Sequence, residues 1–129
     1  MKATRLQGAV MAGGRVLLAS IFVLSGLSKI GAPEATQAYM QAVGVPVALL
    51  WPTIAFELGL GLLIIIGYQT RLAAVLLAGF SLMAGIIFHR NFSDQIQMIM
   101  FLKNVSMAGG FLVLAAAGPG PISFDKRLR

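Results

Sequence analysis

The chain contains no cysteine among its 129 residues, which excludes disulfides, thiolate metal sites and thiol redox chemistry by the chain itself. Charged residues are also scarce: they make up 11% of the chain, about half the share of a typical soluble domain. The chain has one histidine, so a haem or metal site would lack further ligands of the usual kinds. No nucleophile constellation or cofactor-ligand set is visible, which favours an accessory or binding role over an enzyme.

Hydrophobic residues, in contrast, make up 58% of the chain and gather in long runs. A helix rises about 1.5 Å per residue, so about 20 apolar residues cross a hydrocarbon core of about 30 Å. We predict transmembrane helices at about residues 13–30, 46–67, 71–89 and 95–117. The expected fold is all-α, an integral membrane four-helix bundle that forms a single domain over residues 1–129.

The segment between the first two spans predicts a short interfacial helix. Pro33 suits the first turn of a helix, and Glu34 follows it where the helix dipole favours an acid. Tyr39 would then lie at the level of the lipid headgroups. A helix lying on the membrane surface is therefore expected here.

Helix ends are marked by a few local signals. Gly67 is expected to end the second span and Thr70 to cap the third, while Asp94 is expected to cap the fourth. Pro52 either kinks the second span or starts it. Small residues at four-residue spacing, such as Ser81 and Gly85, predict close contacts between helices.

Basic residues flank the apolar runs and predict the orientation of the chain. On the side of the two termini lie Lys2, Arg5, Arg15, Arg71, Lys126, Arg127 and Arg129. On the opposite side lie Lys29, Arg90 and Lys103. By the positive-inside rule, both termini should be cytoplasmic. The basic residues form no continuous stripe, so the expected partner is the lipid bilayer and not a nucleic acid.

One carboxylate, Glu57, lies near the middle of the second predicted span. An ionised carboxylate in hydrocarbon is costly unless it is paired or faces a polar cavity. Lys103 lies at a similar depth in the fourth span, and we predict that it pairs with Glu57. Lys29, His89 and Asn104 belong to the same outer half. The five side chains are therefore candidates for a ligand pocket that opens outward.

Each of these residues also has a plainer interpretation. Lys29 and His89 can be interfacial residues at the ends of spans. Asn104 can be an interhelical hydrogen-bonding residue, and Glu57 with Lys103 can be a purely structural ion pair. At the cytoplasmic end, the GPGP segment that follows residue 117 lets the tail reverse, so Asp125 should pair with Arg15 or Arg71.

Five stretches follow one another along the chain: RVLLASIFVLSGLSKI, YMQAVGVP, FELGLGLLIIIGYQTR, FHRNF and FLKNVSMAGGFLVLAAAGPGPISFD. Together they resemble the DoxX family of small bacterial inner-membrane proteins over nearly the whole chain. The resemblance implies a four-helix membrane bundle. The recurrent polar positions of the family map onto Arg15, Lys29, Glu57, Arg71, His89, Lys103, Asn104, Ser123 and Asp125. Arg15, Arg71, Ser123 and Asp125 are expected to form a structural cytoplasmic cluster.

The resemblance also implies a connection to redox chemistry. The family was named for a subunit associated with a thiosulfate:quinone oxidoreductase, and relatives are linked to redox stress and to quinone or catechol detoxification. Our first hypothesis is an accessory component that binds a quinone-like molecule in the outward pocket beside a redox enzyme subunit. Two alternatives stay open. One is a small-molecule carrier, which would need to form a homo-oligomer, and the other is a membrane scaffold that docks a soluble partner.

Overall fold

The computed structural model describes residues 4–127, and within this range all regular elements are helices. The long helices are α1 (Arg5–Gly31), α3 (Leu50–Ile66), α4 (Thr70–Phe88) and α5 (Gln95–Ala117). The short ones are α2 (Pro33–Ala42), the 3₁₀ turn η1 (Val47–Leu49) and α6 (Phe124–Arg127). Four helices are long and apolar enough to cross a membrane, with η1 included in the second. The predicted all-α, four-span fold is confirmed.

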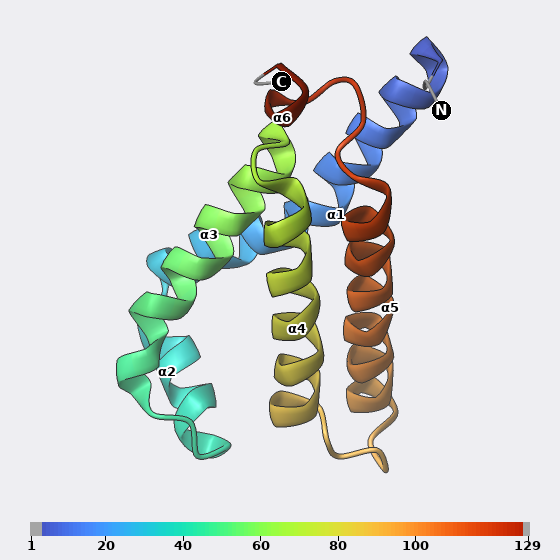
Figure 1. Cartoon of the computed structure of the whole chain (residues 1–129). Helices are drawn as coiled ribbons and strands as arrows, with labels where there is room; N and C mark the ends of the chain where they lie inside the picture. Colours follow the sequence, from blue (N-terminus) through green and yellow to red (C-terminus); the bar gives the residue numbers. More distant parts are fainter. Residues whose placement is uncertain (1–3, 128–129) are drawn as a thin grey trace.

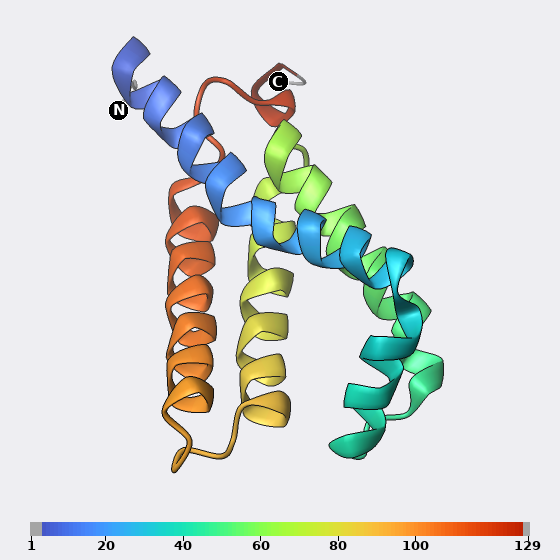
Figure 2. The same cartoon turned by 180° about the vertical axis from the view of Figure 1, so that it is seen from behind.

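The long helices form two antiparallel pairs, α1 with α3 and α4 with α5. The pairs meet toward the end where α1 begins and α6 lies, and they diverge toward the opposite end (Figures 1 and 2). We call the first end the terminal side and the second the loop side. α2 lies on the loop side, next to the beginning of α3 (Figure 1). This divergence places a space for side chains between the two pairs.

Which side faces the cytoplasm stays a prediction of the charge count. Arg5, Arg71 and Lys126 belong to the terminal side, and Arg90 belongs to the loop side. Lys2, Arg129 and the side chain of Arg127 lie outside the part of the chain that the structure describes.

The core lies where the two helix pairs meet. Its buried residues are Ala19, Phe22, Ile64, Ala73, Ala74, Leu77, Ala78, Ala108 and Phe111. The ring of Phe22 on α1 lies edge-on to Phe111 on α5, with ring centroids 5.5 Å apart, and to Phe80 on α4, at 6.2 Å. Phe22 of α1 thus contacts aromatic rings of both α4 and α5. This core joins the α1–α3 pair to the α4–α5 pair.

The turn between α3 and α4 is tight because Gly67 ends α3 in the left-handed conformation, with φ of 75°. Its main-chain N–H donates to the carbonyl oxygen of Leu63 at 2.8 Å. A Cβ at Gly67 would overlap the guanidinium of Arg15 and lie 2.5 Å from the Cβ of Ser123. Both the dihedral angle and the available space therefore require glycine, and the predicted role of Gly67 is confirmed.

The other helix starts were predicted with mixed success. Asp94 caps α5 by accepting a hydrogen bond from the main-chain N–H of Ile96 at 2.9 Å, as expected. Pro52 is the third residue of α3, in the first turn, where a missing N–H breaks no intrahelical hydrogen bond. The prediction that Thr70 caps α4 was wrong. Gln69 is the cap residue, Thr70 is the first residue of the helix, and neither side chain makes the capping bond.

Two further bounds differ from the predicted spans. α1 begins at Arg5, earlier than the predicted span, because Thr4 and Gln7 form a capping box that starts the helix before the apolar run. The short helix after the first span is present as α2, with Pro33 at its start and Glu34 in its first turn. Its buried residue Met40 packs with Leu50 and Ile54. α2 is therefore attached to α3 through a small apolar cluster.

Candidate functional site

A pocket of about 350 Å³ lies between the two helix pairs. α1, α2 and α3 form one wall, and α4 and α5 form the other. Most of the lining is apolar, and four of its side chains are aromatic: Phe22, Tyr39, Phe80 and Phe88. The lining also includes four of the five candidates from the sequence: Lys29, Glu57, His89 and Asn104.

The buried acid of this pocket pairs with a lysine of the neighbouring helix. Glu57 is buried in the middle of α3, and its carboxylate accepts a charge-assisted hydrogen bond from the ammonium of Lys29 in the last turn of α1. The Glu57 side chain is 4% exposed and the Lys29 side chain 21%. Close packing of the two helices permits this contact, because Gly26 of α1 lies against Leu58 of α3. The acid is therefore enclosed, while the lysine reaches from it toward the surface.

The predicted pairing of Glu57 with Lys103 was wrong. Lys103 is exposed and is absent from the described residues that line the pocket. Its neighbour Asn104 faces α4, where its side chain bonds to Ser81. Successive residues of a helix are about 100° apart, so Lys103 points away from the pocket when Asn104 points into it. Similar depth along two spans does not determine which side of α5 faces inward.

On the opposite wall, Asn104 and Ser81 form a second polar pair. Asn104 is buried, and its Nδ2 donates to the main-chain carbonyl oxygen of Ser81 at 3.1 Å. The hydroxyl of Ser81 is buried and has no hydrogen-bond partner within residues 4–127. Both residues line the pocket. In the sequence, Ser81 was distinguished only as a small residue at a predicted helix contact. Its position four residues before Gly85 was the one available signal, and it did not reveal the hydroxyl's environment.

Aromatic and polar contacts lie at the loop-side end of the pocket. Tyr39 of α2 stacks on Phe88 of α4 with ring centroids 5.3 Å apart, and its hydroxyl donates to the carbonyl oxygen of Phe88 at 3.2 Å. Nδ1 of His89 lies 3.0 Å from Oε1 of Gln97, within hydrogen-bonding distance. The Tyr39–Phe88 contact joins α2 to the α4–α5 pair across this end of the pocket.

At the terminal side, the tail folds back as predicted. Asp125 accepts hydrogen bonds from the main-chain N–H groups of Gln69 at 2.8 Å and Thr70 at 3.0 Å, and its own N–H donates to the carbonyl oxygen of Gly67. The carboxylate also attracts the guanidinium of Arg15. Asp125 is therefore the cap that α4 lacks locally. Sequence analysis missed this role because the capping residue comes from 55 positions further along the chain.

The other members of the predicted structural cluster, Arg15, Arg71 and Ser123, also bond to main-chain groups. Arg15 is buried, and its guanidinium donates to the carbonyl oxygens of Pro119 at 3.1 Å and Ile122 at 2.6 Å. Arg71 donates to two carbonyl oxygens in the last turn of α5, at 3.1 and 2.8 Å. Ser123 accepts from the N–H of Lys126 and donates to Gly120. These bonds hold the tail and satisfy groups at helix ends.

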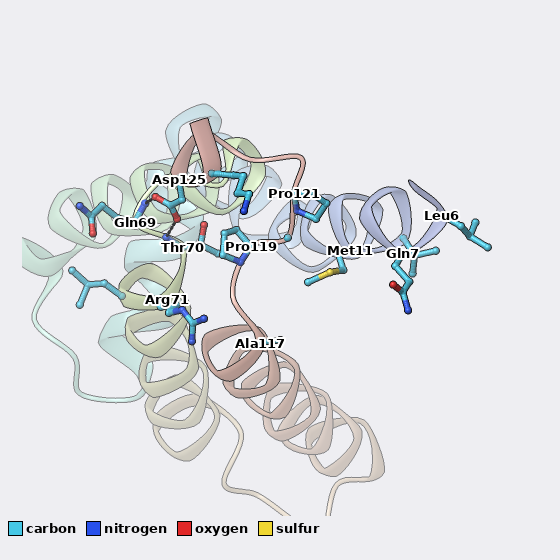
Figure 3. Close-up of a pocket in the computed structure, with 14 residues that line it drawn as sticks. Leu6, Gln7, Met11, Gln69, Thr70, Arg71, Ala117, Pro119, Pro121 and Asp125 are labelled. Atoms are coloured by element: carbon cyan, nitrogen blue, oxygen red, sulfur yellow. Dashed lines mark hydrogen bonds between the residues drawn. The ribbon is translucent and has the colours of Figure 1, made fainter. Parts of the chain in front are cut away.

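A wider hollow of about 1090 Å³ lies on the terminal side, between the start of α1, the start of α4 and the tail. Figure 3 shows Asp125 directed at the main chain of Gln69 and Thr70, with the Arg71 guanidinium near the end of α5. Leu6 and Met11 of α1 line the hollow from the other side (Figure 3). The smaller hollow thus holds the Lys29–Glu57 ion pair, and the wider one lies beside basic residues.

Comparison with known proteins identifies the family. The model of the DoxX family matches residues 10–90, which is more than half of the chain. The chain belongs to the DoxX family. It is 43% identical over 114 residues to inner membrane protein YqjF of Escherichia coli (strain K12), a match that covers 88% of each chain. It is 38% identical over 120 residues to inner membrane protein YphA of the same organism, covering 88% of this chain and 86% of that protein. No solved structure matches the chain.

These relatives and the four apolar helices place this DoxX protein in the bacterial inner membrane as a multi-pass protein. The segment that matches the DoxX model covers most of α1 and all of α2, α3 and α4, so it includes Lys29, Glu57, Ser81 and His89. Asn104 lies beyond that segment, on α5. The wall of the pocket that carries the ion pair therefore belongs entirely to the matched segment.

Proposed function

We propose that this DoxX protein is an accessory component of a quinone-linked redox system and that it binds a quinone-like aromatic molecule in the pocket between its helix pairs. The observation that carries this proposal is the Lys29–Glu57 ion pair in the wall of a largely apolar pocket. Ligand pockets are typically about 300–1,000 Å³, mostly apolar, with a few placed polar groups. The pocket, at about 350 Å³, falls at the lower end of this range and suits a small ring system.

The polar groups suit both redox forms of such a ligand. A quinone carbonyl only accepts hydrogen bonds, and the ammonium of Lys29 is a donor. A hydroquinone hydroxyl donates, and the carboxylate of Glu57 is an acceptor. Phe22 and Phe80, which line the pocket, offer ring faces and edges to a flat aromatic molecule. In this proposal the chain binds and orients the ring, and a redox enzyme subunit carries out the electron transfer.

Binding of 1,4-naphthoquinone to the purified protein in lipid nanodiscs tests this proposal. The chain has no thiol, the group that adds to quinones most readily. Equilibrium dialysis, followed by recovery of the ligand on dilution, separates reversible binding from adducts with lysine. We expect saturable binding of the quinone. Glu57→Gln should weaken binding of its reduced form, 1,4-naphthohydroquinone, about tenfold or more, because it removes the charged acceptor for the hydroxyl. Glu34→Gln is the matched control, since Glu34 is an exposed acid of α2 outside the pocket lining. Absence of saturable binding to the unsubstituted protein would refute the proposal.

The hollow on the terminal side favours a docking role as the second candidate function. Arg71 and Lys126 line it beside apolar residues that include Leu6, and the chain carries a net charge of +6. A soluble redox subunit with an acidic surface would complement this charge. Lys126→Glu should then weaken its binding and reduce the dependence of binding on salt concentration. Unchanged binding of such a subunit by Lys126→Glu would exclude this face.

A further inference from the structure

The hydroxyl of Ser81 stands out among the buried polar groups of the pocket. Ser81 is 1% exposed, and a serine in a helix commonly bonds its hydroxyl to a carbonyl of the preceding turn. Here the hydroxyl makes no such bond and has no other partner within residues 4–127. A buried hydroxyl without a partner lowers stability. Since Ser81 also lines the pocket, a bound molecule can supply the missing partner.

Asn104 is held next to this hydroxyl. Its Nδ2 donates to the main-chain oxygen of Ser81, which orients the carboxamide. The close approach depends on Gly85, where a Cβ would lie 3.2 Å from the Cβ of Asn104. Within the described chain the carboxamide makes no other hydrogen bond, so its second N–H and its carbonyl are available. α4 and α5 therefore contribute the Ser81 hydroxyl and the Asn104 carboxamide to the same wall of the pocket.

These two groups lie on the wall opposite the ion pair. Lys29 and Glu57 belong to α1 and α3, whereas Ser81 and Asn104 belong to α4 and α5. The two helix pairs diverge on the loop side (Figures 1 and 2). Residues of both pairs line the pocket. Each helix pair thus contributes one set of polar groups to the pocket.

We propose that Ser81 and Asn104 form a second polar subsite, so that the pocket selects a flat ligand with oxygen atoms on two opposite edges. This inference rests on the proposed function and adds the ligand's substitution pattern to it. A 1,4-quinone places one carbonyl at the Lys29 end, where the ammonium donates, and the other at the Ser81 hydroxyl. A 1,2-quinone carries both oxygens on one edge. A 1,2-quinone can therefore bond to the polar groups of one wall of the pocket, and the polar groups of the other wall stay without a partner.

Two isomers of one molecule test the inference. Affinities of 1,4-naphthoquinone and 1,2-naphthoquinone are measured by equilibrium dialysis for the unsubstituted protein and for Ser81→Ala. We expect Ser81→Ala to weaken binding of the 1,4 isomer about threefold to tenfold, the size of one neutral hydrogen bond. Binding of the 1,2 isomer should stay unchanged. Ser20→Ala is the control, because the Ser20 hydroxyl already donates to Leu17 on α1, outside the pocket lining.

Thermal stability distinguishes the subsite from a structural role for Ser81. The hydroxyl makes no hydrogen bond within the described residues 4–127, so Ser81→Ala should melt at the same temperature as the unsubstituted protein or higher. The inference is overturned if Ser81→Ala weakens both isomers equally, or neither, while 1,4-naphthoquinone still binds. In that case the proposed function survives. If neither isomer binds the unsubstituted protein, the proposed function and the subsite both fail.

Discussion

Lys29 in the last turn of α1 neutralises Glu57 in the middle of α3, and the two side chains differ in burial, 21% against 4% exposed. This asymmetry decides what each substitution should do. Lys29→Met strands a buried acid without a partner. Glu57→Gln leaves a lysine that already extends toward the surface and can be solvated there. The lysine substitution should therefore destabilise the protein more than the glutamate substitution.

A double-mutant cycle in detergent measures this relationship. We expect Lys29→Met to lower the melting temperature by several degrees, Glu57→Gln to lower it less, and the double variant to regain most of the loss. Lys103→Met is the control, because Lys103 is exposed and lies outside the pocket. Growth under quinone stress adds a second readout. A double variant that regains thermal stability but not growth under quinone stress supports a ligand role for Glu57. A double variant that regains both indicates that Glu57 is a structural residue.

Capping of α4 by the tail gives a second prediction. Asp125→Ala removes the acceptor for the N–H groups of Gln69 and Thr70, and loss of a helix cap typically costs about 0.5–2 kcal/mol. We expect a lower melting temperature and faster proteolysis of the tail after Gly118. Lys126→Ala is the control, since only the main chain of Lys126 bonds to the tail. Unchanged proteolysis of Asp125→Ala would show that Arg15 and Ser123 hold the tail without it.

Local signals account for what the sequence predicted correctly. The four spans follow from apolar runs, and Gly67 and Asp94 end and start helices through contacts within a few residues. Asp125 was expected to return to the terminal side because the GPGP segment cannot continue a helix. In contrast, the Thr70 prediction failed because the cap for α4 comes from the far end of the chain.

The pocket could be predicted only in part, for a geometric reason. Depth along a span follows from counting residues, and it brought Lys29, Glu57, His89 and Asn104 to one half of the bundle. Which helices are neighbours, and how each is rotated, depends on packing between segments distant in sequence. α5 is apolar on nearly all sides, so nothing in its pattern showed that Asn104 and not Lys103 faces inward. For the same reason, the sequence did not show that Ser81 of α4 faces the pocket.

The left-handed turn at Gly67 gives a third prediction. Gly67→Ala places a Cβ at a φ of 75°, against Arg15 and Ser123, so we expect a loss of about 1–3 kcal/mol or more and a less stably attached tail. Gly79→Ala is the matched control within α4, because a Cβ there meets nothing within 4 Å. It should be neutral or slightly stabilising. Similar melting temperatures for the two variants would contradict the tight packing of the turn.

Orientation in the membrane gives the last prediction, and the absence of cysteine makes it direct to test. Ser93→Cys lies in the exposed turn between α4 and α5 on the loop side, and Lys126→Cys lies on the terminal side. If both termini are cytoplasmic, as the distribution of lysine and arginine predicts, a maleimide that cannot cross the inner membrane should label Ser93→Cys in intact spheroplasts. Lys126→Cys should react only after the membrane is permeabilised. The unsubstituted chain, which has no thiol, is the control for background labelling. The reverse pattern would place the ion-pair end of the pocket toward the cytoplasm and overturn the predicted topology.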